Sequence, residues 1–268
     1  MNPKRVTVET TGGVADVRMT RADKHNALDA EMFRSLDAAL DELRATSGLR
    51  AVVLSGDGPS FCSGLDFPSF MQNGLDIAEE LFVHHDGDAA NVAQRITYDW
   101  QRLPVPVIAA LHGNCIGGGA QLALGPDIRI ASSDVRISIL EIKYGLIPDM
   151  GVSQTLPHLV GLDVAKELIF TGRIVEGAEA QRIGLVTRLA DDPRAAALEL
   201  AGEIAMRSPD AIRHGKRLLN EAVWAHAEES LALEESLQRE LLGSPNQIAA
   251  VQAALAKQPA EFTDPEDP

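Results

Sequence analysis

Apolar and polar positions follow two different periods along the first 190 residues, which predicts a chain that alternates strands with helices. Residues 6–19 alternate every second position around a Gly-Gly pair, and this pattern indicates a β-hairpin. Apolar residues then recur at spacings of three and four over 32–43, with Asp29 placed as an N-cap, which predicts a helix. The apolar run within 50–55 predicts a short buried strand.

The remaining pattern divides in the same way up to about residue 190 and is entirely helical after it. The expected elements are a helix at 89–103, a strand, turn and helix at 107–125, strands at 127–131, 135–139 and 185–189, short helices at 151–160, 162–170 and 178–183, and long helices at 191–206, 209–224, 228–242 and 245–257. Residues 68–88 mix apolar residues with acids and histidines, and we expect a loop with a short mobile helix there. The fold class is therefore α/β, with a core over 1–195 and a helical C-terminal region over 196–268.

Composition excludes several classes of function. Hydrophobic residues make up 45% of the 268 residues, as expected for a globular protein with a real core, whereas the net charge of -15 disfavours nucleic-acid and anionic-membrane partners. The two cysteines are too few for a disulfide framework and do not stand at metal-ligand spacing with the histidines, so no metal site is expected. Neither a signal-peptide core nor a transmembrane apolar run is found, which favours a soluble, cytoplasmic protein.

The stretch VIAALHGNCIGGGAQLALG, residues 107–125, carries the first chemical signal. Three consecutive glycines stand where a helix begins, and the first N–H groups of a helix have no partner within it. Glycine also lets a ligand approach bare backbone, so the turn is suited to an anion or to a developing negative charge. A purely structural interpretation, in which the glycines only allow close packing of helix and strand, remains equally open at this point.

A second glycine turn, FCSGLD at residues 61–66, stands in an analogous position after another buried strand. If the two turns converge, one backbone N–H from each can bind the same oxygen. Two such donors form an oxyanion hole, and the loss of one typically costs a factor of about 10²–10³ in rate. The pair of turns therefore suggests stabilisation of a negatively charged intermediate.

Several motifs resemble the enoyl-CoA hydratase/isomerase (crotonase) superfamily, and they agree in order and spacing over residues 5–262. They are FCSGLD, HGNCIGGGAQLAL, DIRIAS, EIKYGLIPDMGVSQTLPHLVG and LIFTGRIVEGAEAQRIGLVTRL. The resemblance implies a crotonase-like spiral of ββα units with a helical C-terminal trimerisation region, assembled as a homotrimer or as a hexamer. It also implies an acyl-CoA thioester as substrate, an enolate intermediate, and no cofactor beyond the coenzyme A of the substrate.

The resemblance further implies roles for individual residues. The backbone N–H groups of Ser63 and Gly118 would hold the thioester oxygen. Residues matching the coenzyme A contacts are Asp23, Lys24, His25 and Ala27 along the nucleotide and pantetheine, and Asp66 and Phe67 on the adenine side. Lys257 resembles a C-terminal lysine that meets the coenzyme A phosphate, although a solvated helix lysine is an equally good interpretation.

Two positions, Gln121 and Asp149, separate this chain from the hydratases it resembles. Gln121 stands where those enzymes carry one of two carboxylates, and an amide can orient a water or thioester but cannot accept its proton. The second carboxylate, Glu141, is present, and Asp149 stands where hydratases have glycine. A Glu and an Asp eight residues apart resemble the dienoyl-CoA isomerase branch, which however carries an acid at the position of Gln121.

The local sequence supports a role for both acids. Glu141 is flanked by Ile139, Leu140 and Ile142, and apolar surroundings raise the pKa of a carboxyl group toward the range useful for proton transfer. A glycine and a proline between Glu141 and Asp149 prevent a single helix, so the two acids can face a cleft from either side of a bend. Outside such a motif, two acids would more often be surface carboxylates.

Three hypotheses follow from these residues. The first is an enzyme that shifts a double bond in an unsaturated acyl-CoA, with Glu141 and Asp149 moving the proton. The second is an enoyl-CoA hydratase with Glu141 as the single acid/base and Gln121 holding the water. The third is an acyl-CoA-binding protein with little turnover. The acyl chain itself is not identified, because it depends on the variable residues 68–88.

Overall fold

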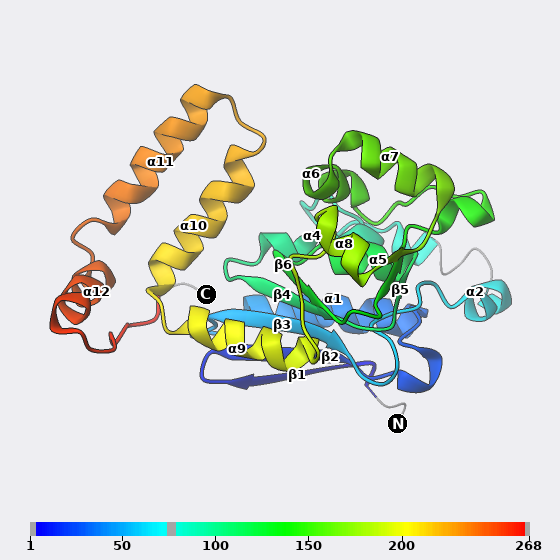
Figure 1. Ribbon diagram of the computed structural model, residues 1–268, viewed down its shortest axis with the longest axis horizontal. Coiled ribbons are helices and arrows are strands. Elements are labelled where there is room, and N and C mark those ends of the chain that lie inside the picture. Colours follow the sequence, from blue (N-terminus) through cyan, green and yellow to red (C-terminus); the bar gives the residue numbers. More distant parts are fainter. Residues whose placement is uncertain (1–3, 74–78, 266–268) are drawn as a thin grey trace.

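A computed structural model describes residues 4–73 and 79–265, and a twisted sheet forms its centre (Figure 1). Within these residues the sheet has six strands in the order β1-β2-β3-β4-β6-β9. Their bounds are β1 Val6–Thr11, β2 Val14–Met19, β3 Ala51–Gly56, β4 Val107–Leu111, β6 Ile128–Ala131 and β9 Arg188–Leu189. The expected hairpin is confirmed as the antiparallel pair β1–β2, and the other pairs are parallel.

A second, three-stranded sheet lies next to the first and carries the glycine-rich turn. Its order is β5-β7-β8, with β5 at Asn114–Ile116, β7 at Arg136–Ser138 and β8 at Val175–Glu176. The sequence pattern missed β5 and β8, which have three and two residues. Such short strands show no period of their own, and only pairing with β7 defines them.

Helices cover both sheets, and several of them begin at capping residues. The core helices and 3₁₀ turns are η1 Ala22–Lys24, α1 Ala30–Arg44, α2 Phe67–Asn73, α4 Val92–Arg102, α5 Gly118–Leu124, η2 Glu141–Tyr144, η3 Val152–Gln154, α6 Leu156–Val160, α7 Leu162–Thr171, α8 Gly177–Arg182 and α9 Pro193–Ala205. Asp29 caps α1 as expected, because its carboxylate accepts a hydrogen bond of 2.8 Å from the Met32 N–H. A reciprocal capping box between Asn91 and Gln94 starts α4.

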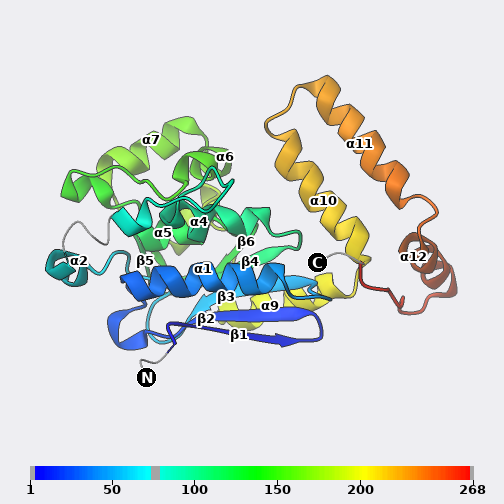
Figure 2. The ribbon, with the colours of Figure 1, turned by 180° about the vertical axis from the view of Figure 1, so that it is seen from behind.

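The main core lies between the large sheet and the helices α1 and α4, and α9 covers the other face of the sheet. Met32, Leu36 and Trp100 are fully buried on the α1–α4 side. Helix α9 lies on the opposite face of the sheet from α1 (Figures 1 and 2), and its Ala197 and Ala201 belong to the apolar cluster on that side. The predicted division at residue 195 therefore falls inside a helix that belongs to the core.

Three helices extend away from this core at its C-terminal end: α10 Pro209–Ala222, α11 Ala227–Leu241 and α12 Pro245–Ala256 (Figure 1). Lys216 fastens α10 to the core, because its ammonium donates to the Asp127 carboxylate at 2.7 Å and to the carbonyls of Trp100 and Val105 at 3.0 and 2.9 Å. The four expected C-terminal helices are thus confirmed. No described helix is long and apolar enough to cross a membrane.

Some boundaries differ from the sequence pattern. The strands expected over 135–139 and 185–189 are shorter in the structure. Only their paired residues, β7 and β9, form hydrogen-bonded ladders with neighbouring strands. The helix expected over 151–160 is divided into η3 and α6, and Thr155 between them is not helical. Of the stretch 68–88, the first six residues, 68–73, all belong to α2, and residues 74–78 lie outside the described part. The mobility expected of this stretch stays a prediction.

Candidate active site

The two glycine turns are joined by backbone pairing. The Cys62 N–H donates to the Asn114 carbonyl at 3.0 Å, and the Ile116 N–H donates to the Cys62 carbonyl at 3.1 Å. Cys62 and Cys115 are the paired residues of this parallel bridge, and both are buried free thiols. Burial raises the pKa of the Cys62 thiol to about 12, which fits the expected role of a small packing residue.

Glycine is required where the turns meet. Gly64 has φ of +88°, and a Cβ on it would lie 2.5 Å from the Ile116 carbonyl oxygen and 3.6 Å from the Gly118 nitrogen. A Cβ on Gly119 would lie 2.3 Å from the Cys62 carbonyl oxygen. Such distances exclude any side chain, so the predicted convergence of the turns is confirmed. The glycines serve close packing and also leave backbone groups next to each other.

The free donors differ from the predicted pair at one position. The Ser63 N–H donates to the His25 carbonyl at 2.9 Å, so it is already used. The N–H groups of Leu65 and Gly118 have no hydrogen-bond partner within the described residues, and both residues line the same cavity. The prediction for Ser63 is therefore corrected, and Leu65 takes its place beside Gly118.

The backbone direction explains why Leu65 was missed. The Asp66 N–H donates to the Leu28 carbonyl at 3.0 Å, on the side away from β5. Neighbouring N–H groups of an extended chain point to opposite sides, so the Leu65 N–H faces β5 and Gly118. The positive φ of Gly64 interrupts the regular alternation of N–H directions between Ser63 and Leu65. No side chain in FCSGLD indicates which of these two N–H groups faces the cavity.

A cavity of about 510 Å³ contains both turns and both candidate acids. Its lining combines the backbone of the turns, a few polar groups and many apolar side chains, an arrangement common in small-molecule sites. The residues are Leu28, Phe33, Ser63, Gly64, Leu65, Phe67, Phe70, Leu81, Phe82, Ala93, Ile116, Gly117, Gly118, Gln121, Leu140, Glu141, Tyr144, Leu146, Ile147, Asp149 and Met150. The structure thus brings together Ser63, Phe67, Gly118, Gln121, Glu141 and Asp149 from the predicted set.

Gln121 is fully buried on α5 and is bound at both ends of its amide. Its Nε2 donates to Glu141 Oε1 at 2.7 Å, and its Oε1 accepts from the Met150 N–H at 2.9 Å. The backbone donor fixes which end of the amide faces Glu141. The second carboxylate oxygen, Oε2 of Glu141, is buried without a partner within the described residues. Glu141 therefore has one oxygen held in place and one left for a ligand.

Burial raises the pKa of both acids from the ordinary carboxyl values. Desolvation raises the pKa of Glu141, the Gln121 hydrogen bond lowers it, and the nearby charge of Asp149 raises it further. Desolvation also raises the pKa of Asp149, which is exposed at the cavity rim. Glu141 lies close to the glycine turn, since a Cβ on Gly117 would be 3.4 Å from Oε1. The cavity can therefore hold and release protons beside two free N–H donors.

The residues matching coenzyme A contacts lie around Ser63. Asp23, Lys24 and His25 are exposed in and after η1, and Ala27 is buried one residue before a cavity residue. The His25 carbonyl holds the Ser63 N–H, so this turn is packed against FCSGLD. These four residues do not line the cavity, and their contact with coenzyme A stays a prediction.

Asp66 and Phe67 have different environments. The Asp66 carboxylate pairs with the buried Arg21 guanidinium at 2.7 Å, which gives it a structural partner. Phe67 lines the cavity and packs on Tyr144 with 4.3 Å between ring centroids. Lys257 ends α12, at the far end of the molecule from α2 and α5 (Figures 1 and 2). A single chain does not bring Lys257 to the cavity.

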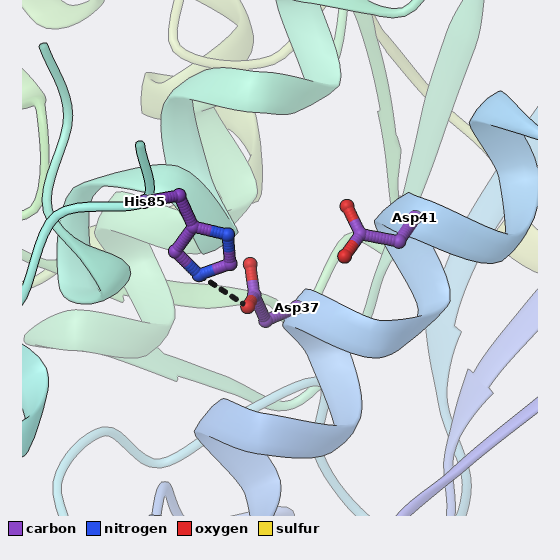
Figure 3. A group of neighbouring side chains, drawn as sticks. All are labelled: Asp37, Asp41 and His85. Carbon is purple, nitrogen blue, oxygen red and sulfur yellow. Dashed lines mark ion pairs between the residues drawn. The ribbon is translucent and has the colours of Figure 1, made fainter. Parts of the chain in front are cut away.

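A cluster of acids outside the cavity has the composition of a cation site but is satisfied internally. Asp37, Asp41 and His85 place their ligand atoms close together, and His85 Nε2 lies 3.1 Å from Asp37 Oδ2 (Figure 3). The buried Arg95 guanidinium bonds both carboxylates, to Asp37 at 2.8 Å and to Asp41 at 2.9 Å. We assign this cluster to holding α1 against α4 and the segment around His85.

Comparison with known proteins identifies the family of this site. The family model described as enoyl-CoA hydratase/isomerase matches residues 9–265. The mouse protein named methylglutaconyl-CoA hydratase, mitochondrial, is 30% identical over 95% of this chain and 81% of its own length. The mouse protein named Delta(3,5)-Delta(2,4)-dienoyl-CoA isomerase, mitochondrial, is 34% identical over 91% of this chain and 77% of its own.

Solved structures agree with the sequence matches. An enoyl-CoA hydratase from Bacillus anthracis superposes with a TM-score of 0.86 at 26% identity, covering 96% of this chain and 98% of that structure. This likeness confirms the expected crotonase-like α/β fold. With its paired glycine turns and nearly full-length family match, the chain belongs to the enoyl-CoA hydratase/isomerase family and is an acyl-CoA enzyme of that type.

Proposed function

We propose that this enzyme shifts a double bond in an unsaturated acyl-CoA by moving a proton between two carbons of the acyl chain. The substrate is a thioester whose oxygen gains negative charge when a proton is removed from carbon. Glu141 and Asp149 exchange the proton with the substrate, and the backbone holds the charged oxygen.

The observation that carries the proposal is the pair of acids at one cavity. Glu141 and Asp149 both line it, and desolvation raises the pKa of each. A proton shuttle needs one group that takes the proton and a second that returns it elsewhere. Carboxyls with raised pKa values suit both tasks near neutral pH.

The oxygen site is formed by Leu65 and Gly118 in this proposal. Their N–H groups have no other partner within the described residues, and the backbone hydrogen bonds of Cys62 with Asn114 and Ile116 hold the two segments together. The donors are fixed before substrate binds, so they need no rearrangement as charge develops.

The environment of Gln121 favours proton transfer over hydration. Activation of a water by two carboxylates requires an acid at this position, but the amide instead donates to Glu141 and accepts from the Met150 N–H. Both ends of the amide are occupied, so Gln121 orients Glu141. An amide is neither an acid nor a base near neutral pH, and it therefore does not exchange a proton with the substrate. Asp149 is then the second acid of the cavity.

The test is an assay of isomerisation with 3-enoyl-CoA and 3,5-dienoyl-CoA, followed by the absorbance of the conjugated product. Glu141→Gln and Asp149→Asn are each expected to lower kcat by about 10²–10⁴, the usual contribution of acid–base catalysis. Glu199→Gln removes an exposed charge from α9 and serves as the control. Full activity of Glu141→Gln would refute the assignment, and binding without any turnover would favour an acyl-CoA-binding protein.

A hydratase is the second candidate, because several relatives are named as hydratases. In it Glu141 would be the single acid/base, with its unpartnered Oε2 facing the water. Crotonyl-CoA separates the two reactions, since hydration removes its enoyl absorbance. Negligible hydration that rises in Gln121→Glu would support the isomerase, and rapid hydration by the unaltered enzyme would support the hydratase.

A further inference from the structure

The charged groups of the cavity all have one sign. Among its described lining residues only Glu141 and Asp149 are ionisable carboxyls, and no lysine, arginine or histidine is present. The nearby Lys143 ammonium lies 5.8 Å from the centre of the Tyr144 ring and is not part of the lining.

The buried part of the cavity is apolar and aromatic. Phe33, Leu81 and Ala93 are 2%, 8% and 5% exposed and come from α1, the segment after α2, and α4. The Phe33 and Phe70 rings meet edge to face with 6.5 Å between centroids. These side chains offer no hydrogen bond to a polar end of an acyl chain.

Ala93 is the smallest side chain in this apolar part. It lies on α4 among larger apolar groups, and its helix is fixed by the Arg95 ion pairs with α1. A longer side chain at position 93 would occupy the cavity, because the surrounding helices cannot move apart without breaking those pairs. The size of residue 93 therefore controls how much of the acyl chain is accommodated.

We infer that the cavity selects an uncharged, apolar acyl group, excludes acyl groups that end in a carboxylate, and has its depth set by Ala93. The inference rests on the proposed function, in that it places the acyl chain of a CoA thioester in this cavity. An acyl carboxylate would lose its water, meet two other carboxylates and find no cation among the described lining residues. An alkyl or aryl end would instead bury apolar surface.

Binding of saturated thioesters tests the charge selection without turnover. Hexanoyl-CoA and the monothioester adipoyl-CoA have the same number of acyl carbons, and only the second ends in a carboxylate. Calorimetry is expected to give at least about 100-fold weaker binding of adipoyl-CoA, since desolvating an unpaired carboxylate costs several kcal/mol. Affinities within about threefold of each other would overturn the inference.

A charge-addition variant is expected to weaken the selection. Phe82 lines the cavity and is 56% exposed, so Phe82→Arg adds a cation without disturbing the core. It is expected to shift the ratio of adipoyl-CoA to hexanoyl-CoA affinity at least about tenfold toward adipoyl-CoA. Met71→Arg adds the same charge outside the lining, where Met71 is 83% exposed, and should leave the ratio unchanged. An equal shift in both variants would contradict selection within the cavity.

A chain-length series tests Ala93. Affinity is expected to rise about fourfold for each added methylene until the cavity is full, as burial of about 0.8 kcal/mol per methylene implies. Ala93→Leu should end this rise at a shorter chain, and the smaller change Ala93→Val keeps the test open if Ala93→Leu does not fold. Ala195→Leu, at an exposed position of α9, is the control. An unchanged limit in a folded Ala93 variant would overturn the assignment.

These measurements separate the inference from the proposed reaction. A protein that prefers hexanoyl-CoA over adipoyl-CoA but does not isomerise any thioester keeps the inference and loses the proposed function. A protein that isomerises 3-enoyl-CoA but binds both saturated thioesters equally keeps the proposed function and loses the inference. Failure to bind either thioester would remove both.

Discussion

Gln121 shows how one side chain connects the chemistry of the site to its framework. Its amide links the Glu141 carboxylate to the Met150 N–H, so the position of Glu141 depends on the backbone next to Asp149. The sequence identified Gln121, Glu141, Asp149 and Gly118 because their residue types stand out in a motif. It could not identify the Leu65 N–H, because a backbone donor depends on local dihedral angles and not on residue type.

Replacing single backbone amides by esters tests the corrected donor. An ester at residue 65 removes one N–H and is expected to lower kcat by about 10²–10³ with little change in stability. An ester at residue 63 removes the bond from Ser63 to the His25 carbonyl, so it should lower stability and affect kcat less. Kinetics and thermal melting of the two semisynthetic proteins distinguish these outcomes. A larger kcat effect at residue 63 would restore the original assignment.

The raised pKa of Glu141 also predicts a change in stability. Desolvation makes the folded protein bind the Glu141 proton more tightly than the unfolded chain does. The ionisable carboxyl therefore destabilises the folded state increasingly as pH rises above the ordinary pKa of a glutamate. Glu141→Gln keeps an oxygen for the Gln121 amide and removes that cost. Urea unfolding should therefore show a more stable variant near about pH 8, with a smaller difference near about pH 4. A stability difference between the variant and the unaltered protein that shrinks as pH rises would contradict this.

At the scale of elements, periodicity predicted what is long and missed what is short. The hairpin, α1 and the C-terminal helices have enough residues to show a period, and caps such as Asp29 mark their starts. β5 and β8 exist only through their pairing with β7, which no local pattern records. The analogous positions of the two glycine turns suggested that they could meet. The distance between them, too short for any Cβ, is set by the pairing of their backbones.

Gly64→Ala tests that contact. The substitution places a Cβ at a φ of +88° and 2.5 Å from the Ile116 carbonyl oxygen, so it should push the two turns apart. Gly87→Ala has a similar φ of +77° with no atom within 4 Å, and measures the backbone cost alone, about 1–2 kcal/mol. Gly64→Ala is expected to lose more stability than this and nearly all activity. Equal stability losses, measured by urea unfolding, would show that the turns can separate freely.

At the scale of the whole molecule, the attachment of the C-terminal helices depends on a few polar contacts. Burial lowers the pKa of Lys216 and raises that of Asp127, and each opposes the effect of the partner's charge. Lys216→Met removes the ion-pair partner of the partly buried Asp127 carboxylate, which is expected to cost up to about 3–5 kcal/mol. Arg217→Met breaks only an exposed pair with Glu221 and should cost less than about 1 kcal/mol. Chemical denaturation of both variants measures the difference, and similar losses would contradict a fastening role.

The outer surface of these helices predicts assembly. Leu219, Leu231 and Leu255 are all more than half exposed, although a helix normally buries its large apolar residues. We propose that they pack on other copies of the chain in a trimer or a hexamer, as the sequence resemblance implies. Light scattering coupled to size exclusion should give a mass of three or six chains. A monomeric mass would contradict the proposal, and Leu231→Lys should weaken the assembly.

The pairing of the two glycine turns has a consequence for how such an enzyme diversifies. The proposed donors at residues 65 and 118 belong to the main chain, so the side chain of Leu65 is free to line the cavity while its amide serves the reaction. Substitutions at residue 65 can therefore alter which acyl group fits without removing the oxygen site. The oxygen site is inherited with the backbone, and substrate choice can evolve in the side chains around it.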